Sequence, residues 1–175
     1  FVHNVKPHAG QIKIANIFNQ LIIDSKLLSE NVHLPNGKKL LQDRYSLRCL
    51  AQFLGPIADG LELIKSQIEV EANSVTDNPL IDADNGRVVH SGNFLGQYIA
   101  IGMDQLRYFI SLLAKHLDAQ MALLVEPTYS NGLPPSLIGS QQEKISLGLK
   151  GLQLTANSML PTLLFNSAPL SNRFQ

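Results

Sequence analysis

The 175-residue sequence contains no tryptophan, one cysteine and no excess of either charge. Cys49 has no second cysteine with which to form an intrachain disulfide, so the sequence is typical of a reducing, cytoplasmic compartment. Lysine and arginine together number 14, as do aspartate and glutamate, and this balance provides no electrostatic attraction for nucleic acid or an anionic membrane. No unbroken apolar run approaches the roughly 18 residues that span a bilayer, so we expect a soluble protein.

Signatures of metal and nucleotide sites are missing as well. The five histidines are scattered, with no pair at the spacing of metal ligands, so no metal site is predicted. No glycine-rich phosphate-binding loop follows a predicted strand. The sequence starts at Phe1 without an initiator methionine and stops at Gln175 without a terminal cap. We therefore expect residues 1–175 to be one piece of a longer protein, truncated at both ends.

Hydrophobic residues make up 45% of the sequence, and they recur at helical spacing over long windows. The spacing predicts a helix that Asp43 caps and that continues to Ile68, with Gly55-Pro56 as a kink within it. A break into two helices at this dipeptide is the alternative. A second long helix is predicted over residues 93–126, with a length of about 51 Å. A helix that long needs packing partners along its whole length, which favours a bundle and contact between subunits.

Three shorter features complete the predicted fold. An apolar stripe of Ile14, Phe18, Leu21 and Leu28, between Pro7 and a loop at residues 33–37, predicts a first helix with Pro7 in its first turn. Residues 80–89 place apolar pairs on both sides of Asp-Asn-Gly at 84–86, which predicts a small hairpin. Residues 140–143 form a capping box that opens a last helix, which carries Leu147. The sequence thus predicts an all-α fold, a bundle of long helices with one small β-hairpin.

The densest polar cluster lies at residues 42–48, at the start of the first long helix. Tyr45 and Arg48 are three residues apart, so on a helix they share a face. The planar fork of an arginine suits a carboxylate, and the tyrosine offers a hydroxyl beside it. The alternative is a surface arginine that pairs with Asp43 or another acid.

Three further candidates lie near predicted helix ends. Asn73 lies in a polar run where the first long helix ends, and Phe94 lies between glycines where the second begins. Lys150 has a glycine on each side within two residues, which lets another group approach the backbone closely. Each has an ordinary alternative: a helix C-terminal cap, the start of a helix, and a solvated lysine.

The order and spacing of these motifs resemble those of the histidine and phenylalanine ammonia-lyase family. The resemblance extends from Val5 to Phe174, and it is closest to the bacterial, cyanobacterial-type phenylalanine ammonia-lyases because of Arg44 and residues 94–98. The motifs that carry it are QDRYSLRC at 42–49, Gln52 with Gly55-Pro56, residues 71–79, Gly92-Asn93-Phe94 and Ser130-Asn131-Gly132-Leu133-Pro134.

The resemblance implies a reaction and a role for each candidate. Members of this family form a methylideneimidazolone electrophile from an internal Ala-Ser-Gly, and they remove ammonia from an aromatic amino acid without an added cofactor. The product from L-phenylalanine is trans-cinnamate. By resemblance, Arg48 would bind the substrate carboxylate, and Gln42 and Asn73 would line the same pocket. The resemblance also implies that Tyr45 would lie beside the electrophile and the departing amine. Phe94 would form a pocket wall, and Lys150 would belong to the second, polar side of the site. The family also implies a homotetramer whose active sites combine several chains.

One departure from the family is decisive for the isolated chain. Residues 1–175 contain no Ala-Ser-Gly, so the electrophile would come from outside them, and we expect this piece alone to be inactive. Tyrosine or histidine ammonia-lyase and the aromatic aminomutases are the alternatives within the family. An alternative of another class is a helical module without catalytic activity that serves oligomerisation, or a pseudoenzyme.

Overall fold

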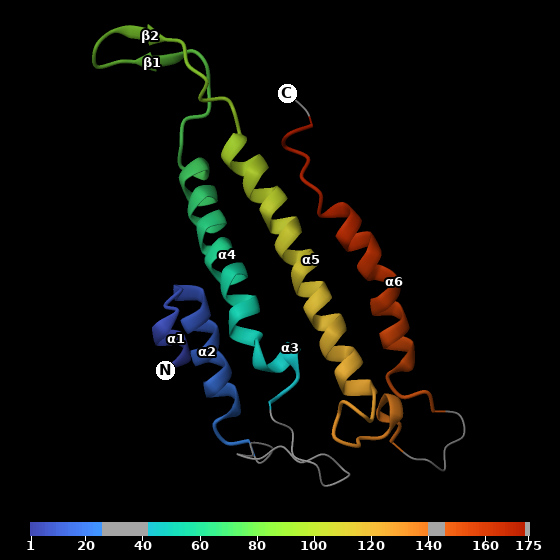
Figure 1. Cartoon of the computed structure of the whole chain (residues 1–175). Helices are drawn as coiled ribbons and strands as arrows, with labels where there is room; N and C mark the ends of the chain where they lie inside the picture. Colours follow the sequence, from blue (N-terminus) through green and yellow to red (C-terminus); the bar gives the residue numbers. More distant parts are fainter. Residues whose placement is uncertain (26–41, 140–145, 174–175) are drawn as a thin grey trace.

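The structure, a computed structural model, describes residues 1–25, 42–139 and 146–173, and this part is mostly helical (Figure 1). It confirms the predicted all-α fold with one small hairpin. The elements are α1 Val2–Val5, α2 Ala9–Ile22, α3 Tyr45–Arg48, α4 Leu50–Ala72, β1 Leu80–Asp82, β2 Arg87–Val89, α5 Gln97–Val125, the 3-10 turn η1 Pro135–Leu137 and α6 Lys150–Asn166.

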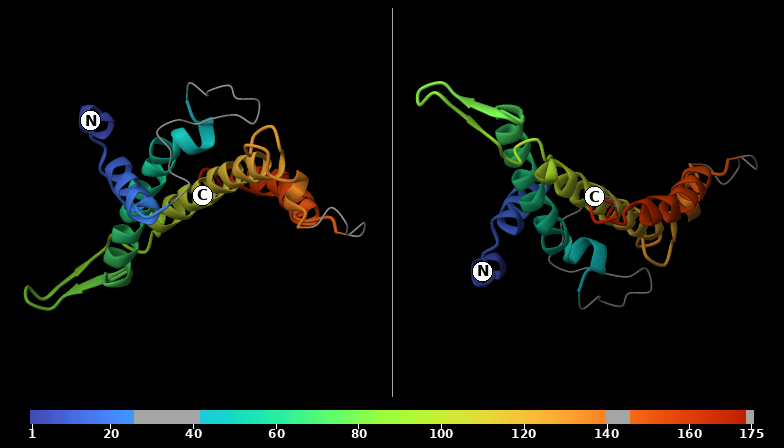
Figure 2. Two further views of the ribbon diagram at one scale, coloured as in Figure 1. Left: turned by 90° about the horizontal axis from the view of Figure 1, so that it is seen from below. Right: turned by 90° about the horizontal axis from the view of Figure 1, so that it is seen from above.

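The four longer helices form an open row. Helix α2 packs on α4, α4 packs on α5, and α5 packs on α6. Figure 1 shows these helices side by side in this order, and Figure 2 shows the antiparallel hairpin reaching away from them beyond the end of α4. Because each helix in the row packs mainly on its neighbours, much of the surface on both sides of the row is left uncovered within the described chain.

Helix α4 is continuous through Pro56, so one helix is confirmed here and the alternative break is wrong. A proline removes a single N–H bond, and the packing of the adjacent Gly55 on α2 supports this turn of the helix. The predicted start is wrong, because the one-turn α3 precedes α4 and Cys49 separates them with φ −99° and ψ 16°. The N-cap of α3 is Arg44 rather than Asp43, without a side-chain cap bond.

The residues of α2 that are fully buried are not those of the predicted apolar stripe, of which Ile14 and Phe18 are half-buried and Leu28 lies outside the described residues. The residues that α2 buries are Gly10, Gln11 and Ala15, whereas Leu21 is 78% exposed. A methyl group on Gly10 would collide with the Gly55 carbonyl oxygen. Small residues let the two backbones approach closely, and they carry no hydrophobic signal in the sequence. The helix begins at Ala9, so the proline precedes its first turn instead of lying in it.

We expect Gly55→Ala to destabilise the protein, although alanine is the better helix former. The new Cβ would lie 2.7 Å from Gln11 Cα, so the helices must separate, at a cost of about 1–3 kcal/mol. Urea unfolding of the full-length protein measures this loss. Gly151→Ala is the matched control, because no atom beyond its chain neighbours and its own helix backbone lies within 4 Å of the added Cβ, and it should be neutral or stabilising. Equal stability of the two variants would contradict the close helix crossing.

Helix α5 has 29 residues and begins at Gln97, four residues after the predicted start. Gly96 has φ −79° and ψ 39° and ends the irregular segment before the helix. The buried residues of α5 are Gly102, Ser111, His116 and Val125, and its half-buried Phe109 packs against Gly60 of α4. Much of the predicted apolar stripe is exposed: Tyr98, Ile101, Leu113, Leu117 and Leu124.

By length and composition, α5 is also apolar enough to cross a bilayer, although the sequence has no long unbroken apolar run that would predict this. Core helices of soluble proteins have the same properties. The exposed stripe is therefore a surface that needs covering, whichever environment covers it.

The last helix, α6, begins at Lys150, so the predicted helix through Leu147 starts too early. The proposed capping box at residues 140–143 lies outside the described residues. After α6, Asp104 of α5 accepts hydrogen bonds from the backbone N–H groups of Ser171 (2.7 Å) and Leu170 (2.9 Å). These bonds lower the pKa of Asp104 to about 2, and they hold the segment that follows α6 against α5.

Candidate active site

Helix α3 presents the two residues at the centre of the sequence prediction. Tyr45 and Arg48 are its first and last residues, and both are exposed, Tyr45 to 70%. Gln42 lies just before the helix and is also exposed. Within the described chain Arg48 has no ion pair, so the alternative pairing with Asp43 is absent there. A charged fork of this kind is available to bind an anion from outside the chain.

A partly buried polar contact joins the middle of α3 to α5. Gln120 of α5 donates a hydrogen bond to the carbonyl of the buried Ser46 at 3.5 Å, and its amide nitrogen lies 3.2 Å from His116 Nε2. The His116 ring stacks on Phe53 of α4 with 4.7 Å between the ring centroids. Burial lowers the pKa of His116, which favours its neutral form. These contacts set the position of α3 on α4 and α5.

Arg44 was not among the predicted site residues, yet the structure gives it partners from a distant segment. Its guanidinium donates to the carbonyl of Thr128 at 3.2 Å and lies over the Tyr129 ring, 5.1 Å from the centroid. Both partners belong to the turn that follows α5. Sequence patterns do not reveal this contact, because it joins residues 84 positions apart.

Asn73 and Phe94 lie near the other end of α4. The Asn73 side chain donates to the Glu69 carbonyl at 2.7 Å, as a C-terminal cap does. The Asn73 amide therefore bonds to its own helix, in agreement with the alternative role of a helix C-terminal cap. Phe94 is 59% exposed, in the turn before α5. Beside these residues a groove of about 510 Å³ lies between the end of α4 and the start of α5, lined by residues that include Glu71, Ser74, Thr76, Asn93 and Tyr98.

Lys150 is the first residue of α6 and is exposed. Its ammonium group donates to Gln153 Oε1 at 3.0 Å. Another group does approach the backbone closely at a neighbouring glycine, as predicted. That group is the backbone of this same chain and not a ligand. Gly148 has φ +52°, and a side chain there would collide with the Ser136 carbonyl, which accepts a 2.7 Å hydrogen bond from Leu149 N–H. This contact fixes where α6 begins.

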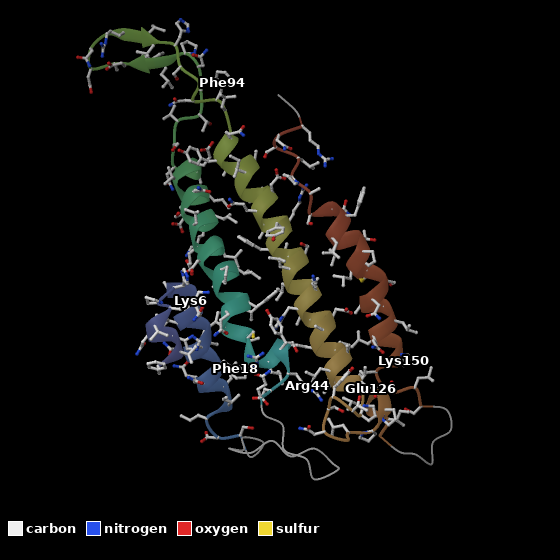
Figure 3. All side chains as sticks on the ribbon, in the orientation of Figure 1. Lys6, Phe18, Arg44, Phe94, Glu126 and Lys150 are labelled. Carbon is white, nitrogen blue, oxygen red and sulfur yellow. The ribbon has the colours of Figure 1, made fainter. Side chains whose placement is uncertain are left out.

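A single chain does not bring the six candidates together. Gln42, Tyr45 and Arg48 share one end of the row, whereas Asn73 and Phe94 lie at the other. The 23 residues of α4 that separate these groups span about 34 Å. Figure 3 shows Phe94 at one end and Arg44 and Lys150 at the opposite end. Among the described residues, no three His, Cys, Asp or Glu side chains group as metal ligands.

Comparisons with known proteins show which family the chain resembles. The family model described as "Aromatic amino acid lyase" matches residues 1–175. The chain is 57% identical to a phenylalanine ammonia-lyase of Nostoc punctiforme, over 99% of this chain and 31% of that protein. It is 36% identical to a phenylalanine aminomutase of Taxus chinensis, over 97% of this chain and 25% of the relative. It therefore spans about a third or less of the length of these curated relatives.

Solved structures agree with this placement. The structure of Pantoea agglomerans phenylalanine aminomutase superposes with a TM-score of 0.87 at 33% identity, covering 98% of this chain and 36% of that one. A phenylalanine ammonia-lyase from Rhodosporidium toruloides superposes with a TM-score of 0.86 at 29% identity, covering 97% and 24%. With the family model matching from the first residue to the last, the chain belongs to the aromatic amino acid lyase family.

Proposed function

We propose that the chain is the central helical part of a longer phenylalanine ammonia-lyase, which converts L-phenylalanine to trans-cinnamate and ammonia. The observation that carries this proposal is the exposed pair on α3, a tyrosine and an arginine fork without an ion-pair partner in the described chain. The 57% identity to the Nostoc punctiforme phenylalanine ammonia-lyase supports the choice of substrate. The single cysteine supports a cytoplasmic location for the enzyme.

In this proposal Arg48 binds the substrate carboxylate through two parallel hydrogen bonds. A carboxylate fixed at one end of the substrate lets the Cβ proton be aligned for removal, which lowers the barrier to elimination. Gln42 lies three residues before Tyr45 and would line the same pocket. The Tyr45 hydroxyl would lie beside the departing amine, where it can exchange a hydrogen bond with that group.

The family's methylideneimidazolone group supplies the electrophile for the amino group when it is present. No Ala-Ser-Gly occurs in residues 1–175, so we infer that this group comes from another part of the protein and that no added cofactor is needed. The residues present fit such a group. Tyr45 and Phe94 are 70% and 59% exposed, so both side chains can line a group supplied from elsewhere. Asn73 and Lys150 already bond within their own helices and would take part only by exchanging those bonds.

We infer that the full-length protein is a homotetramer with active sites built from several chains. The candidates at the two ends of α4 are about 34 Å apart, so one chain cannot place them around one small substrate. The exposed stripe of α5 leaves apolar surface that a second copy would cover. Sedimentation of the full-length protein at micromolar concentration is expected to show a tetramer. A clean monomer would contradict this inference.

The function is tested by following cinnamate formation. The full-length protein should convert L-phenylalanine without added metal, nucleotide or pyridoxal phosphate, and it should show the near-ultraviolet absorbance of its prosthetic group. The 175-residue polypeptide alone should show neither property. Turnover by this piece alone would overturn the proposal, because nothing in it can form the electrophile. A full-length protein inactive on every aromatic amino acid would favour the helical module or pseudoenzyme.

A second candidate function within the family is an aromatic aminomutase. Similarity to phenylalanine aminomutases, 36% identical in sequence and with a TM-score of 0.87 to a solved structure, favours it as the alternative. The same assay separates the two, because a mutase accumulates β-phenylalanine whereas a lyase releases ammonia with cinnamate. Replacing L-phenylalanine by L-tyrosine or L-histidine tests the remaining alternatives.

A further inference from the structure

Helix α3 is only four residues long, so it cannot hold its own position. Among its backbone bonds, Leu47 and Arg48 donate to the Arg44 carbonyl, and Cys49 donates to the Tyr45 carbonyl. At its C-terminus α3 is held by Cys49, which also caps α4, so side-chain contacts are needed to hold its middle and its N-terminus. Gln120 provides one anchor at Ser46, in the middle of the helix.

Arg44 provides the other anchor, at the N-terminus of α3. Its guanidinium donates to the Thr128 carbonyl at 3.2 Å and covers the face of the Tyr129 ring at 5.1 Å from the centroid, within the range of a cation–π interaction. The Nε atom is buried and has no hydrogen-bond partner. The Arg44 side chain is thus buried at Nε, whereas its hydrogen bond to Thr128 lies at the surface and Tyr129 is 50% exposed.

The turn that Arg44 contacts is held together by its own backbone hydrogen bonds. In the turn after α5, Tyr129 N–H and Ser130 N–H both donate to the Glu126 carbonyl, at 2.9 and 3.0 Å. Gly132 N–H donates to the Pro127 carbonyl at 2.9 Å. A shallow cavity of about 200 Å³ separates this turn from the start of α3, with Arg44 and Tyr129 both in its wall. Within the described chain, the bond from Arg44 is the only hydrogen bond that joins the start of α3 to this turn.

We propose that Arg44 is a positioning residue of the active site, which docks α3 on the turn after α5 and so sets the aim of Tyr45 and Arg48. The proposal rests on the proposed function, because its consequence for turnover requires those two side chains to act on substrate. In this proposal Arg44 acts through α3 and not by touching the substrate. Its guanidinium is held by Thr128 and Tyr129, which leaves the neighbouring Arg48 as the free cation of α3.

The test removes each half of the contact in the full-length protein. Arg44→Met and Tyr129→Leu should each lower kcat/KM for L-phenylalanine about tenfold, with little change in the midpoint of thermal unfolding. The double variant should lose no more than Arg44→Met alone, because both substitutions break one contact. The conservative variants Arg44→Lys and Tyr129→Phe keep the cation and the ring, so each should retain most activity. Arg87→Met is the matched control, since Arg87 pairs with Asp82 in the hairpin, far from α3, and it should have no effect.

Hydrogen exchange separates this proposal from the proposed function. Arg44→Met should speed exchange of the amides of Leu47, Arg48 and Cys49, whereas Arg87→Met should not. A wild-type protein without turnover would refute the proposed function, and the exchange rates would then still show whether Arg44 anchors α3. Unchanged exchange, or full activity of both Arg44→Met and Tyr129→Leu in an active protein, would overturn the positioning role. If Arg44→Met does not fold, the activity and the hydrogen exchange of Tyr129→Leu decide whether this contact positions α3.

Discussion

Tyr45→Phe is expected to lower kcat of the full-length protein by roughly 10²- to 10⁴-fold, the usual contribution of a side chain that exchanges a proton or hydrogen bond with a reacting group. The substitution removes a single hydroxyl from a side chain that is 70% exposed. Phenol and phenyl groups have nearly the same volume, and the hydroxyl makes no hydrogen bond within the described chain, so stability should not change. Cinnamate formation at saturating L-phenylalanine measures the effect.

Tyr108→Phe is the matched control for this prediction. Tyr108 is also an exposed tyrosine, but it lies in the middle of α5, away from α3. Its loss of a hydroxyl should leave kcat unchanged, and thermal unfolding should show both variants to be folded. Full activity of Tyr45→Phe would remove Tyr45 from the mechanism.

Arg48→Lys is expected to lower kcat/KM by roughly 30- to 1000-fold, equivalent to about 2–4 kcal/mol of transition-state stabilisation. Lysine keeps the positive charge but lacks the planar fork that makes two parallel bonds to a carboxylate. Arg48 has no ion-pair partner in the described chain, so the substitution should not alter folding. Steady-state kinetics with L-phenylalanine, alongside thermal unfolding, provide the measurement.

Two other arginines serve as comparisons. Arg44→Lys should cost far less than Arg48→Lys, because a lysine can still place its charge over Tyr129. Arg87→Lys, in the hairpin, should cost nothing measurable because it keeps the charge opposite Asp82. Equal losses at positions 44 and 48 would mean that Arg48 has a structural role and that its assignment to the substrate carboxylate is wrong.

The sequence alone determined the kinds of elements, because these depend on local periodicity. Apolar residues at helical spacing predicted α4 through Gly55-Pro56 and most of α5, and apolar pairs around a tight turn predicted the hairpin. The order of the motifs also identified the family, which the match over residues 1–175 confirms. The predicted starts of α5 and α6 were too early, because these helices begin at Gln97 and Lys150. Glycine-rich segments, and backbone contacts with residues distant in the sequence, decide where these helices begin.

Which faces are buried, and what holds the candidate site, depended on the tertiary structure. The crossing of α2 and α4 relies on Gly10 and Gly55, residues without an apolar side chain that a periodicity could reveal. The anchoring of α3 relies on Arg44 and Thr128, which are 84 positions apart. The six candidate residues follow each other in the sequence as family motifs, yet α4 separates them into groups at opposite ends of the row. A motif records which side chains are present, whereas the rigid length of a helix decides which of them one chain can bring together.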